Sequence, residues 1–166
     1  MKRLAPLLLI AAVLGGCGLR PLYGGGESSS AAQLLRSVLV QPIGGGRTGW
    51  LVRTALVDRL GEPGTGARYR LEVELDDDLT GYGIRGDSAV TRERRTLRAR
   101  YRLVDAATGG VVIDATAVSD AGVDVVGSEY ATLAAEQTAV ERLSEIVADQ
   151  IVARIGLYAA RSGTGS

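Results

Sequence analysis

The chain has 166 residues, of which 46% are hydrophobic, and its 19 basic and 19 acidic side chains leave no formal net charge. It contains no histidine and one cysteine, which excludes metal sites built on imidazole or paired thiolates and catalytic triads built on histidine. The charge balance is far from the strongly basic one that is typical of a nucleic-acid binder, so we expect no nucleic-acid partner.

The first 17 residues predict an export signal. Two basic residues precede the apolar run Leu4–Leu14, and Gly15 and Gly16 lead directly into Cys17. A charged start, an apolar middle and small residues at the cleavage point are typical of a secretory signal, and 11 apolar residues are too few to span a bilayer, which takes about 20. A cysteine in this place resembles a lipobox, so we expect cleavage before Cys17 and acylation of its thiol. The alternative is a plain secretory signal with a chance cysteine.

Cleavage after the signal peptide 1–16 would leave 150 residues, with 17 basic and 19 acidic side chains. That length suits one domain. Glycine and serine dominate the next segment, so we expect residues 17–33 to form a lipidated flexible tether. Residues 34–158 would form the folded domain, and residues 159–166 a disordered tail.

The first part of the domain predicts a strand followed by a helix. Val38–Ile43 is apolar, and Pro42 favours the edge of a sheet or the end of a strand. After three glycines, apolar residues recur at helical spacing over Thr48–Leu60, and Gly61 and Pro63 mark the end of that helix.

Three strands are predicted next. Apolar and charged residues alternate strictly over Arg68–Asp76, and the Gly- and Asp-rich segment Asp77–Asp87 predicts a turn. Alternation resumes over Val90–Val104, with Leu97, Ala99, Tyr101 and Leu103 on one face. The hairpin loop Asp105–Gly110 leads into a third strand over Val111–Ser119.

A last amphipathic helix follows, with Ser128 as its N-cap and Gly156 as its end. The order of elements is therefore β-α-β-β-β-α. Strands that alternate so cleanly have one covered and one wet face, and two amphipathic helices are enough to cover the first. The sequence thus predicts an α/β (α+β) two-layer sandwich, in which a small mixed or antiparallel sheet of about four strands packs against two helices.

The sharpest feature of the domain is a stripe of arginines on the outward face of the second long strand. Its members are Arg92, Arg94, Arg98, Arg100 and Arg102. Such a row could bind phosphates or carboxylates through paired, charge-assisted hydrogen bonds. Cross-strand pairing with Glu72, Glu74, Asp76 and Asp114 is the competing interpretation. Arg85, Arg92 and Arg94 have fewer obvious acidic partners, so we expect them to be the ligand contacts.

We find no catalytic constellation in the sequence. The run Asp76–Asp78 lacks the spacing of an EF-hand calcium loop, and Ser128 has no base partner in the sequence pattern. We therefore expect no catalytic residue, no metal and no cofactor, and a protein that binds rather than reacts.

Several segments together resemble the LptE family of outer-membrane lipopolysaccharide-assembly lipoproteins, in its alphaproteobacterial form. The resemblance covers nearly the whole chain, and it rests on the order and spacing of five segments. These are Cys17–Gly24, Arg68–Leu71, Ile84–Asp87, Arg100–Asp105 and Ser128–Glu136. The segment Gly44–Gly49 departs from it, because it is richer in glycine than the usual lead into the first helix.

The resemblance implies an outer-membrane lipoprotein, lipid-anchored through Cys17 in the inner leaflet and facing the periplasm. It implies a plug within the lipopolysaccharide-transport β-barrel (LptD), which aids assembly of the barrel and delivery of lipopolysaccharide to the cell surface. It also implies an α/β sandwich, in agreement with the pattern above. The alternatives are an auxiliary lipoprotein of a phospholipid-transport system, a cell-wall hydrolase and a purely structural envelope protein.

Overall fold

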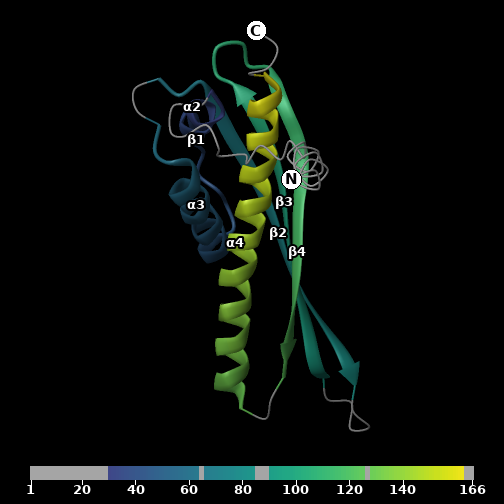
Figure 1. Ribbon diagram of the computed structural model, residues 1–166. Coiled ribbons are helices and arrows are strands. Elements are labelled where there is room, and N and C mark those ends of the chain that lie inside the picture. The colour runs from purple at the N-terminus through teal and green to yellow at the C-terminus, as the bar shows by residue number, and fades with distance from the viewer. Residues whose placement is uncertain (1–29, 64–65, 85–89, 126–127, 163–166) are drawn as a thin grey trace, which may run out of the picture.

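The computed structural model describes residues 30–63, 66–84, 90–125 and 128–162 (Figure 1). Its elements are α2 (Ser30–Arg36), β1 (Val38–Val40), α3 (Gly46–Leu60), β2 (Tyr69–Ile84), β3 (Val90–Asp105), β4 (Val111–Asp124) and α4 (Glu129–Ser162). The predicted signal peptide and Cys17 lie outside the described residues. The strands form one mixed sheet with helices packed against it, which confirms the predicted fold class.

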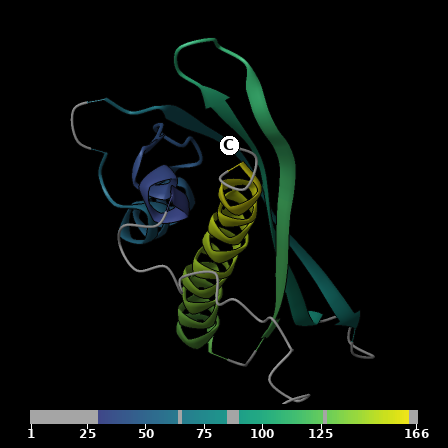
Figure 2. The same cartoon turned by 45° about the horizontal axis from the view of Figure 1, so that its top comes forward.

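The sheet has the order β1-β2-β3-β4. β2, β3 and β4 form an antiparallel meander, and the short strand β1 adds in parallel to the start of β2, with α3 as the crossover between them. α3 and α4 lie on one face of this sheet (Figure 2). The other face is covered by no helix in the described part of the chain, as the alternating pattern predicted.

The core lies between that sheet face and the helices. Leu97, Ala99, Tyr101 and Leu103 of β3 are at most 3% exposed, so the predicted inward face is confirmed. α4 contributes a helical stripe to the same cluster, namely Leu143, Val147, Ile151 and Ile155. Burial of large apolar side chains, at about 25 cal/mol per Å² of apolar surface, is the main force that holds the two layers together.

The strands of the meander differ in length from the prediction. β2 continues to Ile84 and β4 to Asp124, where ends at Asp76 and Ser119 were expected. The reason is cross-strand pairing. The ladder between β2 and β3 continues through Asp77, which lies opposite Leu97, and Tyr82, which lies opposite Arg92. Ladder hydrogen bonds to a long partner strand outweigh the low strand propensity of aspartate and glycine.

The helices also depart from the prediction. α4 does not end at Gly156 but continues to Ser162, because Gly156 and Ala159 are buried in its packed face and tertiary contacts offset the cost of an internal glycine, about 1 kcal/mol. α2 was not predicted. It begins within the segment expected to be a tether, and Leu35 joins the core. Seven residues are too few to show a helical period.

The domain is long and narrow. A strand of 16 residues and a helix of 34 residues both span about 50 Å (Figure 1). None of the helices in the described ranges is long and apolar enough to cross a membrane.

Candidate functional site

The outer face of the sheet carries the arginine stripe. From Arg92 to Arg102, even-numbered residues of β3 point to this face, and odd-numbered ones point to the helices. The five predicted arginines are all exposed there, and they extend along most of the length of β3. The structure therefore brings together Arg92 and Arg94, two of the three expected ligand contacts, and Arg85 lies outside the described residues.

Most of these arginines pair with acids of the flanking strands. The ion pairs are Arg92–Asp124 (3.1 Å), Arg94–Asp120 (3.8 Å), Arg100–Asp114 (3.2 Å) and Arg102–Glu72 (3.0 Å). The cross-strand pairing considered from the sequence is thus present in the fold. Because the side chains are largely exposed, each such pair stabilises the fold by less than about 1 kcal/mol.

In the sequence pattern Arg92 and Arg94 have fewer obvious acidic partners than the other arginines, but in the fold each of them pairs with an aspartate. The pattern predicted that β4 ends at Ser119, whereas the strand continues and places Asp120 and Asp124 beside them. Arg94 also lies over the ring of Tyr82, with its guanidinium carbon 5.5 Å from the ring centroid. These contacts hold both guanidinium groups at the surface, where an anionic ligand can compete with the weak ion pairs.

Arg98 differs from the rest of the stripe. It lies opposite Asp76 of β2 and Val118 of β4 in the register of the sheet. No ion pair or hydrogen bond joins its side chain to another described residue, although four arginines around it are paired. At the centre of the outer face, Arg98 therefore forms no ion pair with any acid of the described ranges.

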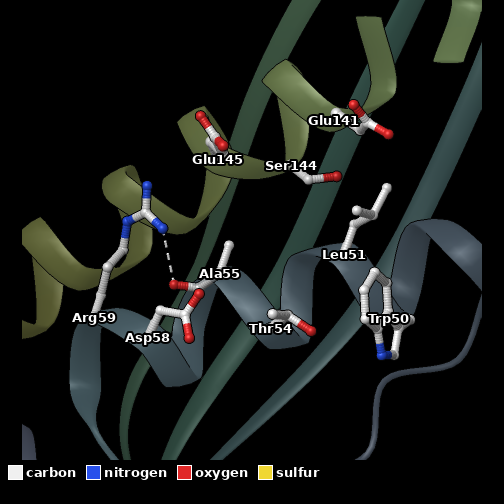
Figure 3. A pocket seen from close by; sticks show the side chains of 9 residues that line it. All are labelled: Trp50, Leu51, Thr54, Ala55, Asp58, Arg59, Glu141, Ser144 and Glu145. Carbon is white, nitrogen blue, oxygen red and sulfur yellow. Dashed lines mark hydrogen bonds between the residues drawn. The ribbon is translucent and has the colours of Figure 1, made fainter. Parts of the chain in front are cut away.

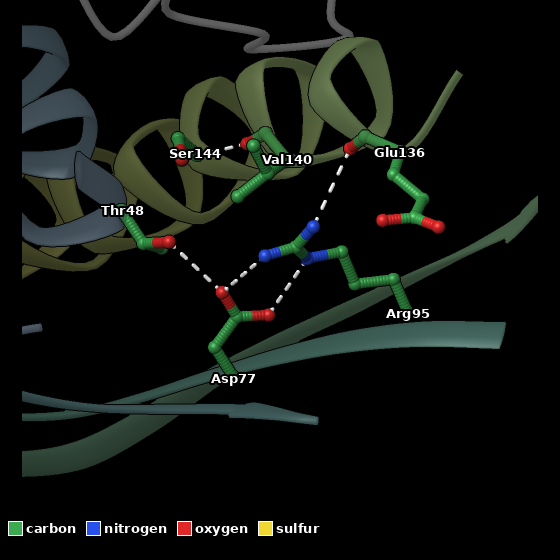
Figure 4. A network of polar contacts seen from close by, with 6 residues as sticks. All are labelled: Thr48, Asp77, Arg95, Glu136, Val140 and Ser144. Atoms are coloured by element: carbon green, nitrogen blue, oxygen red, sulfur yellow. Dashed lines mark hydrogen bonds and ion pairs between the residues drawn. The ribbon is translucent and has the colours of Figure 1, made fainter. Parts of the chain in front are cut away.

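A second charged cluster lies on the opposite, helix-facing side of the sheet (Figure 4). Arg95 binds Asp77 through two hydrogen bonds, Nε to Oδ1 and Nη2 to Oδ2, each 2.8 Å long. Thr48 of α3 donates its hydroxyl to Asp77 (2.9 Å), and Arg95 donates to the carbonyl oxygen of Glu136 in α4 (3.5 Å). One ion pair therefore connects β2, β3, α3 and α4.

The cluster is electrostatically well matched. The hydrogen bonds from Arg95 lower the pKa of Asp77 below its usual value, against the opposing effect of burial, and the bond from Thr48 adds to the lowering. Asp77 likewise raises the pKa of Arg95. This cluster was not predicted from the sequence. Arg95 has an odd number, like the inward-facing Leu97, and this placed it on the helix-facing side of the strand. Its partner could not be predicted, because Asp77 was expected to lie in a turn.

A shallow groove lies between α3 and α4 (Figure 3). It has a volume of about 240 Å³, and Trp50 at its end is 63% exposed. Arg59 closes the other end, where it donates to the carbonyl oxygen of Ala55 (2.9 Å) and to Asp149 (2.5 Å). Glu141 and Glu145 line the side formed by α4. Ser144 also lines the groove, and its hydroxyl donates to the carbonyl oxygen of Val140 (2.7 Å).

Comparison with known proteins agrees with this architecture. The sequence profile of the family described as "LptE: Lipopolysaccharide-assembly" matches residues 35–155, whereas no curated protein matches. Among solved structures, a lipoprotein from Caulobacter crescentus CB15 is 26% identical, with a TM-score of 0.64 over 81% of this chain and 98% of its own.

Two further structures share the fold at lower identity. The first is the rare lipoprotein B of Shewanella oneidensis, with 10% identity and a TM-score of 0.54 over 76% of this chain and 96% of its own. The second is the minor lipoprotein of Acinetobacter baumannii, with 13% identity and a TM-score of 0.55 over 75% of this chain and 95% of its own. The family profile spans the domain from α2 to the last turns of α4. The chain therefore belongs to the LptE family and functions in lipopolysaccharide assembly.

Proposed function

We propose that the protein is an outer-membrane lipoprotein that works as a subunit of the lipopolysaccharide translocon. Acylated Cys17 would anchor it in the inner leaflet, and the domain would insert as a plug into the transport β-barrel LptD. It would aid assembly of the barrel and passage of lipopolysaccharide by binding alone, without catalysis. The observation that carries the proposal is the family match over residues 35–155.

The shape and surface of the domain support the role of a plug. The body is narrow and about 50 Å long, and its outer sheet face is covered with charged side chains rather than apolar ones. Large barrels enclose polar, water-filled or plugged interiors, so a charged face is compatible with such a lumen. None of these features favours the alternative role in phospholipid transport.

We further propose that Arg85, Arg92 and Arg94 contact the phosphates of lipopolysaccharide. The guanidinium forks of Arg92 and Arg94 are exposed and held by weak ion pairs, with 3.1 Å and 3.8 Å between nitrogen and oxygen. A phosphate carries more charge than one carboxylate and can accept two parallel hydrogen bonds from each fork. Lipopolysaccharide would thus replace Asp124 and Asp120 at these arginines.

Co-purification tests the translocon role. Tagged protein extracted from the membranes of its native host should bring a very large β-barrel with it. The variant C17A should leave the membrane and appear in the periplasm, because a chain without acyl groups lacks the anchor. Recovery of the tagged protein without any barrel would refute the role as a plug, whatever happens to the variant.

Lipopolysaccharide binding is tested by a matched pair of double variants. R92A/R94A should bind lipopolysaccharide about tenfold more weakly, since it loses charge-assisted hydrogen bonds. R100A/R102A removes the same charge from the same sheet face, about 27 Å further along β3, and should bind normally. Equal losses in both variants would indicate nonspecific attraction, and a preference for phospholipid vesicles would favour the alternative function.

A further inference from the structure

Within the described residues, β4 forms an open edge of the sheet, since β3 is the one strand that pairs with it. In an antiparallel strand, the N–H and C=O groups of every second residue point to the same side. The N–H and C=O groups of Val118 point away from β3, as their hydrogen bonds to the side chain of Gln150 in α4 show. The backbone groups of Asp114 and Thr116 therefore point the same way, and no hydrogen bond satisfies them within the described residues.

Gln150 occupies one position of this edge. Its Oε1 accepts a hydrogen bond from the N–H of Val118, and its Nε2 donates one to the carbonyl oxygen of the same residue, both 3.2 Å long. A side-chain amide has the donor and the acceptor of a peptide group, so it replaces one residue of a missing neighbouring strand. Covering an edge in this way blocks further pairing at that point.

The face of α4 beside this edge is positively charged. Gln150, Arg154, Leu157 and Arg161 follow one another at spacings of four, three and four, which places them on one side of the helix. Three of them, Arg154, Leu157 and Arg161, line a hollow of about 260 Å³ together with Tyr158 of α4 and with Val112, Ile113 and Asp114 of β4.

The charges in the hollow are not balanced. Asp114 already pairs with Arg100, whereas no ion pair joins Arg154 or Arg161 to another residue of the described ranges. Leu157 adds an apolar surface that is 43% exposed. The hollow therefore offers two free guanidinium groups and an apolar contact beside unsatisfied backbone donors and acceptors.

We propose that the edge of β4 from Val112 to Thr116 binds an extended segment of a partner protein that carries acidic side chains. The segment would add a strand to the sheet, and its carboxylates would bind Arg154 and Arg161. A lipid phosphate could also meet these arginines, but only a peptide backbone alternates donors and acceptors in step with the edge. The site lies about 30 Å from Arg92 along the strands and does not rest on the proposed lipopolysaccharide contacts.

A synthetic peptide tests the proposal. The probe is a fluorescent peptide of about eight residues with glutamate at alternate positions, added to the full chain in a nonionic detergent. Saturable binding is expected, with slower hydrogen exchange at the amides of Asp114 and Thr116. A peptide with lysine in place of glutamate should bind at least about tenfold more weakly, and R154Q/R161Q should weaken binding of the glutamate peptide as much.

Two variants test the backbone edge itself. T116P removes one edge N–H without touching the ladder to β3, and should weaken binding about tenfold. Q150A frees the N–H and C=O of Val118 and should tighten binding several-fold, which keeps the proposal testable if T116P fails to fold. Three results would overturn it: absence of binding, full competition by inorganic phosphate with no effect of either variant, or a dimer of the chain that T116P abolishes.

Discussion

Arg94 and Arg95 are neighbours on β3, yet their side chains reach opposite faces of the sheet. Arg94 is 59% exposed and lies 3.8 Å from Asp120, a distance at which only a weak ion pair forms. Arg95 is 19% exposed and makes two 2.8 Å hydrogen bonds to one carboxylate. An ion pair with two hydrogen bonds and little solvent contact stabilises a fold far more than a single long contact in water. Arg95 is therefore a structural residue, whereas its neighbour Arg94 is available to a ligand.

The substitution R95A should lower the free energy of unfolding by about 2 kcal/mol, because it leaves Asp77 partly buried without its main partner. The matched control R94A removes the same side chain one position earlier and should cost less than about 1 kcal/mol. Urea denaturation followed by circular dichroism measures both values. Similar losses in the two variants would show that the Arg95–Asp77 pair stabilises the fold no more than the exposed Arg94–Asp120 pair does.

The same pair makes stability depend on pH. Arg95 lowers the pKa of Asp77 in the folded state below its usual value of 3.8, so the folded chain holds the proton less tightly than the unfolded chain. The stabilisation is therefore complete above about pH 4 and is lost as the pH falls through the lowered pKa. When the free energy of unfolding is measured from neutral to acidic pH, it should fall less in D77N than in the wild type. The same fall in both proteins would show that Asp77 is not the cause of the pH dependence.

The alternation of residues alone was enough to put Arg92 and Arg94 on one face and Leu97 on the other. It could not identify their partners. The partner of Arg95 lies 18 positions away, and the pairing depends on the strand register and on a ladder that continues through Asp77 and Asp78. Local propensity predicts a turn there, but pairing with the long strand β3 keeps the segment extended.

At the scale of an element, the start of α3 depends on a close approach of two chain segments. A Cβ atom on Gly49 would lie 2.2 Å from the carbonyl oxygen of Gly44 and 2.7 Å from that of Ile43. No side chain fits in this space, and both obstacles are backbone atoms that cannot turn away. The glycine at position 49 is therefore what allows the helix to pack there.

The substitution G49A should therefore destabilise the domain by about 1–3 kcal/mol, the cost typical of overpacking. G44A is its control, since a Cβ atom at Gly44 meets nothing within 4 Å and the variant should unfold like the wild type. Thermal unfolding of both proteins measures the difference. A normal melting temperature for G49A would mean that α3 can shift away from Gly44 at little cost.

The order of the major elements could be predicted because each long element carries a clear period. α2 and the last turns of α4 could not, for two different physical reasons. Seven residues show no period, and α2 is held by Leu35 in the core rather than by its own pattern. Gly156 is a normal stop signal, but the packed face of α4 continues past it through Ala159.

At the scale of the whole molecule, the two ends of the long body differ in packing. The buried positions of α4 begin at Ala139 and continue to Ala159, whereas its first turns, over residues 129–138, have no buried side chain. Tyr130 and Leu133 are exposed there, and so are Leu79 and Tyr82 near the end of β2. The end that carries Arg92 and Arg94 is therefore the less tightly packed one.

This gradient predicts how the molecule opens. Local stability follows buried apolar contacts, so the amides of residues 133–138 should exchange hydrogen at least about tenfold faster than those of residues 143–155, after correction for intrinsic rates. Hydrogen exchange followed by mass spectrometry at neutral pH measures this along one continuous helix, in which the second segment serves as the internal control. Equal protection of both segments would mean that α4 opens as a single unit. The sheet would then have to stabilise the first turns of α4 without burying their side chains.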